Sequence, residues 1–327
     1  MNSESTSAPE RFGVQAEGRV TFWGRLVRWG PYQAILTLIY ASPRRQFVLL
    51  ATLPVLWVLT QHLGPMLQML KVSLTDAYPV AQNAESHFTL EHYAKFFGDS
   101  LFWMPFFRTL TFAAVFTFAT LILTYPVAYF LARHVSRKNQ LLFLLILLVP
   151  FWVGEIVRTY AIMILLGNTG AVNLALKWLG LIDRPIPFMY TSFSMGVGIV
   201  YLTALYMLLP LYSALEKLPQ SYWEAAADLG AGPWTRFRRV TLPLTVEGIS
   251  SGCTLVFLIS TGFYATPVLL GGPSTTVFAE TIAGFFHVAG DEWPTGAAFA
   301  TVMFLAALAI SGLFQRLMYM LRKGDTR

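Results

Sequence analysis

The amino-acid sequence predicts an all-α polytopic membrane protein with six transmembrane helices. Of its 327 residues, 55% are hydrophobic and only 12% are charged, whereas soluble domains carry about 25% charged residues. Six apolar runs reach the ~20 residues that a helix needs to cross the hydrocarbon layer. Basic residues are spread through the short segments between these runs, which argues against a nucleic-acid-binding protein.

The six runs predict spans at residues 46–70, 105–131, 140–166, 191–214, 247–270 and 295–321. Residues 46–321 therefore form one membrane domain, preceded by a tail of residues 1–45 and followed by a tail of residues 322–327. In the first tail, aromatic and basic residues between positions 19 and 28 fit an interfacial helix. A plain solvated tail fits them equally well.

The basic residues predict the direction of the spans. With both termini in the cytoplasm, the cytoplasmic segments hold 17 of the 23 Lys and Arg residues. Positive charge is enriched in cytoplasmic loops of membrane proteins. Both tails and the segment between the fourth and fifth spans are therefore expected to be cytoplasmic.

The sequence argues against a catalytic site or a metal site in this chain. The single cysteine, Cys253, excludes an intrachain disulfide and a cysteine-based metal site. The string GISSG (248–252) is better explained by small residues at a helix-packing face than by a nucleophile, since the five histidines fall at span ends or in loops. No zinc-protease or nucleotide-binding motif occurs, so we expect no catalytic residue, metal ligand or cofactor in this chain.

A polar segment, EAAADLGAGPWTRFRRVTLPL (224–244), separates the fourth and fifth spans. Ser221 and Glu224 have the three-residue spacing of a capping box, which predicts a short helix that begins there. Three consecutive alanines favour that helix, and Gly230 suits the left-handed residue that ends it.

A second small helix is predicted directly after this turn. Gly232 and Pro233 are expected to begin this helix, because the N–H that proline lacks has no hydrogen-bond partner at the first helical position. Pro243 is expected to prevent further regular helix. The second helix carries three basic residues, Arg236, Arg238 and Arg239.

The polar segment resembles the signature of the permease subunits of binding-protein-dependent ABC importers. That signature is Glu-Ala-Ala, three residues, Gly, nine residues, then Ile-x-Leu-Pro. An ordinary capped loop would explain the caps but not the whole spacing. The matching residues, with one conservative change, are Glu224, Ala225, Ala226, Gly230, Val240, Leu242 and Pro243.

The resemblance implies the type I ABC importer permease fold, with residues 215–245 as a coupling loop whose helices dock into a cytoplasmic ATPase. It implies two ATPase subunits, which bind ATP and magnesium, a second permease that we take to be different, and a periplasmic or extracellular binding protein. The expected location is the bacterial inner membrane, with no nucleic-acid partner. ATP-driven closure of the ATPases would switch the spans between inward-open and outward-open states.

Three further stretches make the chain most similar to spermidine/putrescine-type permeases: PFWVGEIVRTYAIMILLGNTG, GFYATPVLLGGP and FTLEHYAKFF. A polyamine or another small organic cation is the implied substrate. The chain departs from this group at Phe263, where relatives often carry an acid, so an amino acid, an opine-like compound or a sugar remains an alternative. A membrane-embedded enzyme and a passive channel are the rival classes.

Four residues within the spans are candidates for the translocation path: Glu155, Arg158, Phe263 and Tyr264. An ionisable side chain in mid-membrane costs at least ~2.5 kcal/mol and is a functional hypothesis by default. Glu155 and Arg158 are three residues apart, so a same-face structural ion pair is the alternative. The two aromatic residues could hold an ammonium group or serve only in helix packing.

Overall fold

The computed structural model describes residues 30, 42–79, 86–287 and 292–324. The chain divides into two compact units, residues 1–67 and residues 68–327. In the described part, regular structure is helical except for an isolated antiparallel bridge between Thr75 and Phe88. The all-α prediction is thus confirmed, while the interfacial helix considered for residues 19–28 lies outside the described residues.

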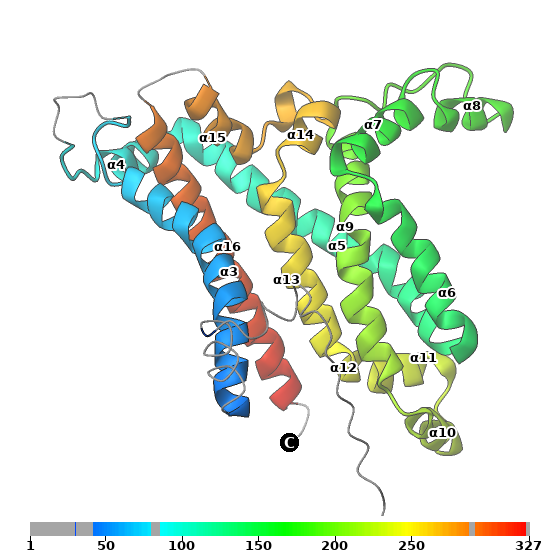
Figure 1. The fold of residues 1–327 in the computed structure, drawn as a ribbon. Helices are drawn as coiled ribbons and strands as arrows, with labels where there is room; N and C mark the ends of the chain where they lie inside the picture. Colours follow the sequence, from blue (N-terminus) through cyan, green and yellow to red (C-terminus); the bar gives the residue numbers. More distant parts are fainter. Residues whose placement is uncertain (1–29, 31–41, 80–85, 288–291, 325–327) are drawn as a thin grey trace, which may run out of the picture. The chain divides into compact units, whose positions relative to one another are not determined.

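The first predicted span is contained in α3 (Pro43–Val72), whose last residues belong to the second unit. The second unit holds the remaining predicted spans and the connections between them (Figure 1). Its helices are α4 (Glu91–Gly98), α5 (Trp103–Arg133), α6 (Arg137–Leu148), α7 (Glu155–Leu166), α8 (Ala171–Trp178), α9 (Ser192–Glu216), α10 (Gln220–Asp228), α11 (Pro233–Arg236), α12 (Leu242–Leu244), α13 (Val246–Gly262), α14 (Ala265–Leu270), α15 (Phe278–His287) and α16 (Trp293–Gly324).

Five described helices are long and apolar enough to cross a membrane, and a bent pair makes a sixth if it counts as one span. The bent pair joins Pro233–Leu244 to Val246–Gly262 at an angle of 65°. The second, fourth and sixth predicted spans coincide with α5, α9 and α16 to within three residues at each end.

The third predicted span is broken rather than continuous. After α6 comes a 3-10 turn, η2 (Val149–Trp152), and α7 begins after the N-cap residue Gly154. Pro150 lacks the N–H of a regular helix turn, and glycine has low helix propensity. Both residues favour the break.

Length and hydropathy alone select Glu155–Trp178 as the third span, but the contacts favour α6, η2 and α7 together. The Tyr212 hydroxyl on α9 donates a hydrogen bond to Gln140 at the start of α6 (3.1 Å). Further along, the rings of Phe151 and Tyr206 lie 5.1 Å apart. Asn173 of α8 instead binds the adjacent loop through the carbonyl oxygen of Ile186 (3.0 Å).

The fifth predicted span is broken as well. α13 ends at Gly262, Phe263 has extended backbone angles (φ −65°, ψ 128°), and α14 begins only at Ala265. The two broken spans meet at their breaks, because the hydroxyl groups of Thr159 on α7 and Thr266 on α14 are 3.1 Å apart.

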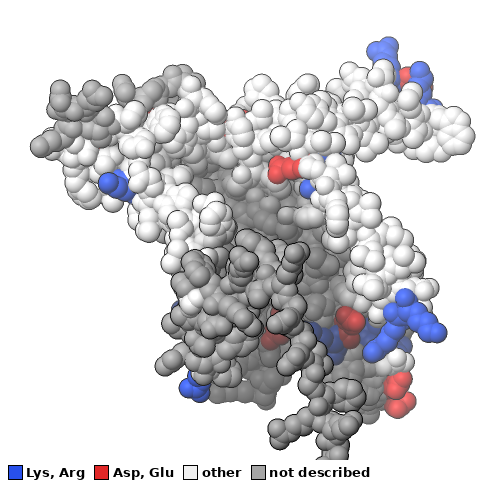
Figure 2. All heavy atoms as spheres, viewed as in Figure 1, with Lys and Arg blue, Asp and Glu red and all other residues white. Residues whose placement is uncertain are grey.

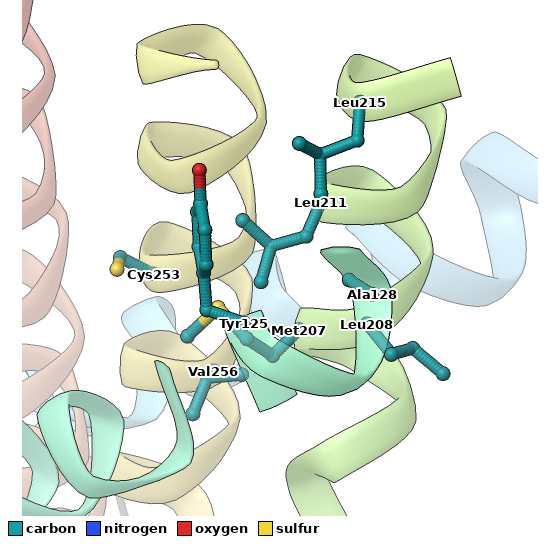
Figure 3. Packing of buried hydrophobic residues seen from close by; sticks show 8 residues of the cluster. All are labelled: Tyr125, Ala128, Met207, Leu208, Leu211, Leu215, Cys253 and Val256. Carbon is teal, nitrogen blue, oxygen red and sulfur yellow. The ribbon is translucent and has the colours of Figure 1, made fainter. Parts of the chain in front are cut away.

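The core of the second unit lies between α5, α9 and α13. Figure 3 shows its side chains converging from these three helices. Cys253, the single cysteine, is buried in this core, so it serves in helix packing. The cluster consists of Tyr125, Ala128, Met207, Leu208, Leu211, Leu215, Cys253 and Val256.

Glycines let α9 and α13 approach closely. A Cβ atom on Gly248 would lie 2.5 Å from Cβ of Ala214 and 2.7 Å from the carbonyl oxygen of Pro210. One on Gly252 would lie 2.7 Å from Sδ of Met207. Small residues commonly allow such contacts between membrane helices. The expected packing role of the GISSG string is therefore confirmed.

The replacement Gly248→Val should separate α9 from α13, because overpacking a tight contact typically costs ~1–3 kcal/mol. The midpoint of thermal unfolding of the purified protein in detergent should fall. Gly312→Val on α16 is the matched control, since a Cβ there would meet nothing within 4 Å. Equal midpoints for the two variants would show that the glycine contact does not limit stability.

Candidate functional site

The polar loop between α9 and α13 has the turn that its sequence predicts. Gly230 has φ +79°, in the left-handed region that favours glycine. Its N–H donates to the carbonyl oxygen of Ala227 (2.8 Å), and the N–H of Ala231 donates to that of Ala226 (3.0 Å). These two bonds form the Schellman arrangement that ends α10.

The start of α10 differs from the prediction. The helix begins at Gln220, with Pro219 at the N-cap position and no side-chain cap hydrogen bond. Ser221 therefore lies within the first turn, and the predicted capping box with Glu224 is wrong. Pro219 has an extended ψ of 137°, so the helix begins directly after it, one residue before the serine.

The second helix begins as predicted but continues further. Gly232 is the N-cap of α11 and Pro233 is its first residue. Beyond α11, a π-helical segment (Phe237–Thr241) leads directly into α12. Pro243 does not interrupt this path, contrary to the prediction, because it lies in the first turn of α12, where a missing N–H is tolerated.

The loop presents both apolar and charged side chains on its surface. Leu229 and Trp234 are 88% and 71% exposed. Glu224, Arg238 and Arg239 are exposed as well, whereas Arg236 is half-buried. Figure 2 shows charged atoms gathered around α10 and α11, while the surface over most of α6 is uncharged. An exposed apolar surface rimmed by charge is typical of a protein-binding site.

An aromatic and arginine cluster that the sequence did not reveal holds this loop to the end of α5. The guanidinium carbons of Arg133 and Arg236 lie 5.5 and 5.7 Å from the centre of the Trp223 indole ring. The Tyr129 ring on α5 lies 5.7 Å from the same indole. Trp223, directly before Glu224, is the one sign of this cluster in the loop sequence. Its partner Arg133 lies 90 residues earlier in the chain, so sequence reasoning could not pair them.

A second link joins the loop to the core between α5, α9 and α13. The hydroxyl groups of Tyr125 on α5 and Thr245 are 3.0 Å apart, and both residues are buried. The Tyr125 ring also contacts Phe237 edge to face, with 5.7 Å between centroids. Thr245 lies at the bend between α12 and α13, so this buried contact joins the bend to α5.

Glu155 lies at the other end of the core, where the two broken spans meet. It is the first residue of α7, where the helix dipole favours a negative charge. The Thr266 hydroxyl donates a hydrogen bond of 3.4 Å to its carboxylate. The Glu155 side chain is otherwise exposed in this chain.

The ion pair that we considered as the alternative role of Glu155 and Arg158 does not form in the structure. Among the described residues the one salt bridge joins Lys95 to Glu292 (3.1 Å). The Arg158 guanidinium lies instead over the Phe151 ring, 5.0 Å from its centre. Residues three apart share a helix face, but here the two side chains have different partners. Glu155 contacts Thr266 on α14, and Arg158 contacts Phe151 in η2.

The two aromatic candidates differ in their surroundings. Phe263 is 9% exposed and packs in a cluster with Phe116 and Met195. Tyr264 is 43% exposed and immediately precedes α14. Only Tyr264 therefore presents a free aromatic face close to the Thr266 that bonds Glu155.

The apolar spans, the two breaks and the exposed helical loop together define a subunit of a membrane transporter. The chain is 39% identical over 212 residues to a spermidine/putrescine transport system permease protein of Escherichia coli (strain K12), which is 64% of this chain and 76% of the relative. It is 30% identical over 293 residues to an inner membrane ABC transporter permease protein of the same organism, 84% and 93% of the two chains. The chain therefore belongs to the family of permease subunits of binding-protein-dependent ABC importers.

The fold agrees with this membership. A bacterial ABC transporter involved in the import of the acidic polysaccharide alginate contains a chain with a TM-score of 0.66 at 18% identity, covering 85% of this chain and 96% of that one. The same transporter in complex with an alginate-pentasaccharide-bound periplasmic protein gives a TM-score of 0.65. No family model matches the chain.

Membership in this family defines what the chain does. It is a multi-pass protein of the inner membrane and a transport component rather than a catalytic one. In this class of importer, ATP is bound by the ATPase partners. Within the described ranges, no three His, Cys, Asp or Glu side chains gather in a way that could hold a metal ion.

The replacement Trp223→Ala should loosen the polar loop, because it removes two cation–π contacts, each of about 0.5–2 kcal/mol. Limited trypsin digestion of the purified protein should cleave after Arg238 or Arg239 roughly tenfold faster. Tyr222→Ala is the matched control, since Tyr222 is the neighbouring aromatic on α10 and is 52% exposed. If both variants are cleaved at the wild-type rate, the cluster does not hold the loop.

Proposed function

We propose that this permease imports a small organic cation, with polyamines as the preferred class. One observation carries the proposal: the Glu155 carboxylate lies exposed at the meeting point of two broken spans. A membrane-embedded carboxylate without a paired cation attracts positively charged solutes. The named function of the relative at 39% identity supports the same class.

The path we propose runs past α7 and α14 on the Glu155 side. Glu155 would accept hydrogen bonds from an ammonium group, and the Tyr264 ring could add a cation–π contact of about 1 kcal/mol. Phe263 is buried in a cluster of apolar side chains, so it would support the path by packing and not by contact with the solute. Arg158 would repel a cation, and its contact with Phe151 turns it away from Glu155, so we leave it out of the path.

We propose that residues 215–245 are the coupling loop for an ATPase subunit. Exposed apolar side chains beside exposed charges support a docking role. Ser221 and Arg236 would act within the loop, and the remaining residues would contribute to its shape or surface. These are Glu224, Ala225, Ala226, Gly230, Arg238, Arg239, Val240, Leu242 and Pro243.

The complete importer that we propose contains a second, different permease, two ATPase subunits and an external binding protein. The ATPase subunits bind ATP and magnesium. Their closure would move the coupling loop, and Tyr125 and Thr245 would transmit the movement to α13. Because α13 leads into the break before α14, access to Glu155 would alternate between the two sides of the membrane.

The proposed topology places both termini in the cytoplasm. Its support is the positive-inside distribution of the basic residues. The structure adds that Arg238 and Arg239 lie exposed on the proposed cytoplasmic loop. Residues 1–45 and 322–327 would then be cytoplasmic tails of a membrane domain formed by residues 46–321.

The replacement Gly230→Val should uncouple the importer, because a β-branched side chain is strained at φ +79°. Stimulation of ATPase activity by the loaded binding protein should fall in the reconstituted complex, while binding of the solute to the binding protein persists. Gly230→Asn is the control, since asparagine tolerates the left-handed region. Normal stimulation in Gly230→Val would contradict the coupling role.

The replacement Glu155→Gln should reduce uptake of radiolabelled putrescine or spermidine by proteoliposomes. The loss of a charged hydrogen bond is worth about 1.5–3 kcal/mol, so apparent affinity should fall roughly tenfold or more. Basal ATPase activity and assembly should persist. Glu91→Gln, an exposed acid at the start of α4, is the control.

Adding Arg158→Gln to Glu155→Gln separates a substrate contact from a structural pair. Since the two side chains have different partners in the structure, the second change should not restore cation uptake. Restored uptake in the double variant would establish a structural pair and exclude the substrate contact. Wild-type uptake in Glu155→Gln alone would also exclude it.

A further inference from the structure

A long apolar cavity lies between α5, α6 and α9, and its lining includes neither Glu155 nor any residue of α14. Its volume is ≈ 880 Å³. On α9 its lining extends from Ser192 to Leu208, which is about 24 Å of helix. Most of the lining is aliphatic or aromatic, and one residue in it is charged, Arg158.

Part of the cavity lining is exposed on the surface of the second unit. Leu123 on α5, Ile146 on α6 and Phe193 on α9 line it and are 61%, 55% and 57% exposed. In a protein of the inner membrane, side chains of this kind face lipid or another subunit. The cavity is thus open at an apolar face of this chain.

Arg158 lacks an anionic partner in the described part of the chain. Its Nε atom is buried without a hydrogen-bond acceptor, and the nearby Glu155 is bonded to Thr266. The Phe151 ring covers the guanidinium on one side but supplies no negative charge. A cation inside a spanning segment is costly unless an anion pairs with it.

The position of Arg158 along α7 suits a lipid headgroup. It lies eight residues before the end of α7 at Leu166, about 12 Å of helix. A hydrocarbon layer of ~30 Å then places it in the half of the span nearer the end of α7. An arginine in that half of the span can pair with a phosphate group of the nearer leaflet.

The charge in the lining decides between a lipid and an apolar helix of another subunit. Arg158 has a buried Nε atom without a hydrogen-bond acceptor, and an anionic phospholipid supplies a phosphate for it, whereas an apolar spanning helix supplies no anion. A flexible acyl chain fits a long, narrow, apolar space. The cavity is also unsuitable as a translocation path for a cation, because its lining has a positive charge and no carboxylate.

We propose that this cavity binds an anionic membrane phospholipid. Its acyl chain fills the space between α5, α6 and α9, and its phosphate pairs with the Arg158 guanidinium. The bound lipid fills the gap between α6 and the core helices, so it holds the first half of the broken third span in place. The site is separate from the proposed cation path at Glu155.

The experiment uses the assembled importer in nanodiscs that contain phosphatidylglycerol with a photoactivatable acyl chain, diluted in phosphatidylcholine. After illumination, mass spectrometry of peptides should locate the label on α5, α6 and α9 around the cavity. Arg158→Gln should reduce the label about fivefold, the effect of one basic residue on an anionic lipid. Arg158→Lys should retain it, and Arg184→Gln, a loop arginine outside the cavity, should leave it unchanged.

Ala204→Trp tests the cavity independently of charge, because Ala204 lines it and the larger side chain would fill it. The label should be lost although Arg158 is intact. Excess inorganic phosphate should not displace the label; displacement would indicate a free-phosphate site and overturn the proposal. Equal labelling by a phosphatidylcholine probe, or crosslinking of Ala204→Cys to the second permease in place of lipid, would also overturn it.

Discussion

The close contact between α9 and α13 is the constraint on which the other features depend. Gly248 and Gly252 allow the two backbones to approach, and the buried leucines of α9 and Val256 then fill the space against α5. In lipid, apolar area alone does not favour helix association, so close van der Waals contact must supply much of the energy. A small-residue seam meets that requirement.

The same two helices connect the two regions to which we assign functions, the polar loop and the Glu155 site. α9 leads into α10 and α13 follows α12, so the polar loop begins and ends on the seam. At its other end α13 leads through Phe263 and Tyr264 into α14, next to Glu155. The seam packs the central helices tightly, while the breaks and the bend at Thr245 interrupt their regular backbone. Rigid helices joined by such breaks are suited to alternating access.

Charge within the spans is divided between two environments. Glu155 faces the break between α13 and α14, where helix termini and hydroxyl groups supply polar contacts. Arg158 faces an apolar cavity and an aromatic ring. In the functions that we propose, the separation leaves a negative charge for a cationic solute and a positive charge for a lipid anion, which a mutual ion pair would have neutralised.

The sequence by itself determined the apolar spans, the all-α class and the turn at Gly230, because each depends on local composition or on one residue's backbone preference. Its spacing signature also indicated the family. Local reasoning failed at Ser221 and Pro243, where the preceding proline and a π-helical segment changed the helix boundaries. The tertiary structure alone decided the partners of Glu155, Arg158 and Trp223. Spacing along a helix sets which side chains could meet, but neighbouring elements from distant parts of the chain determine which way each side chain turns.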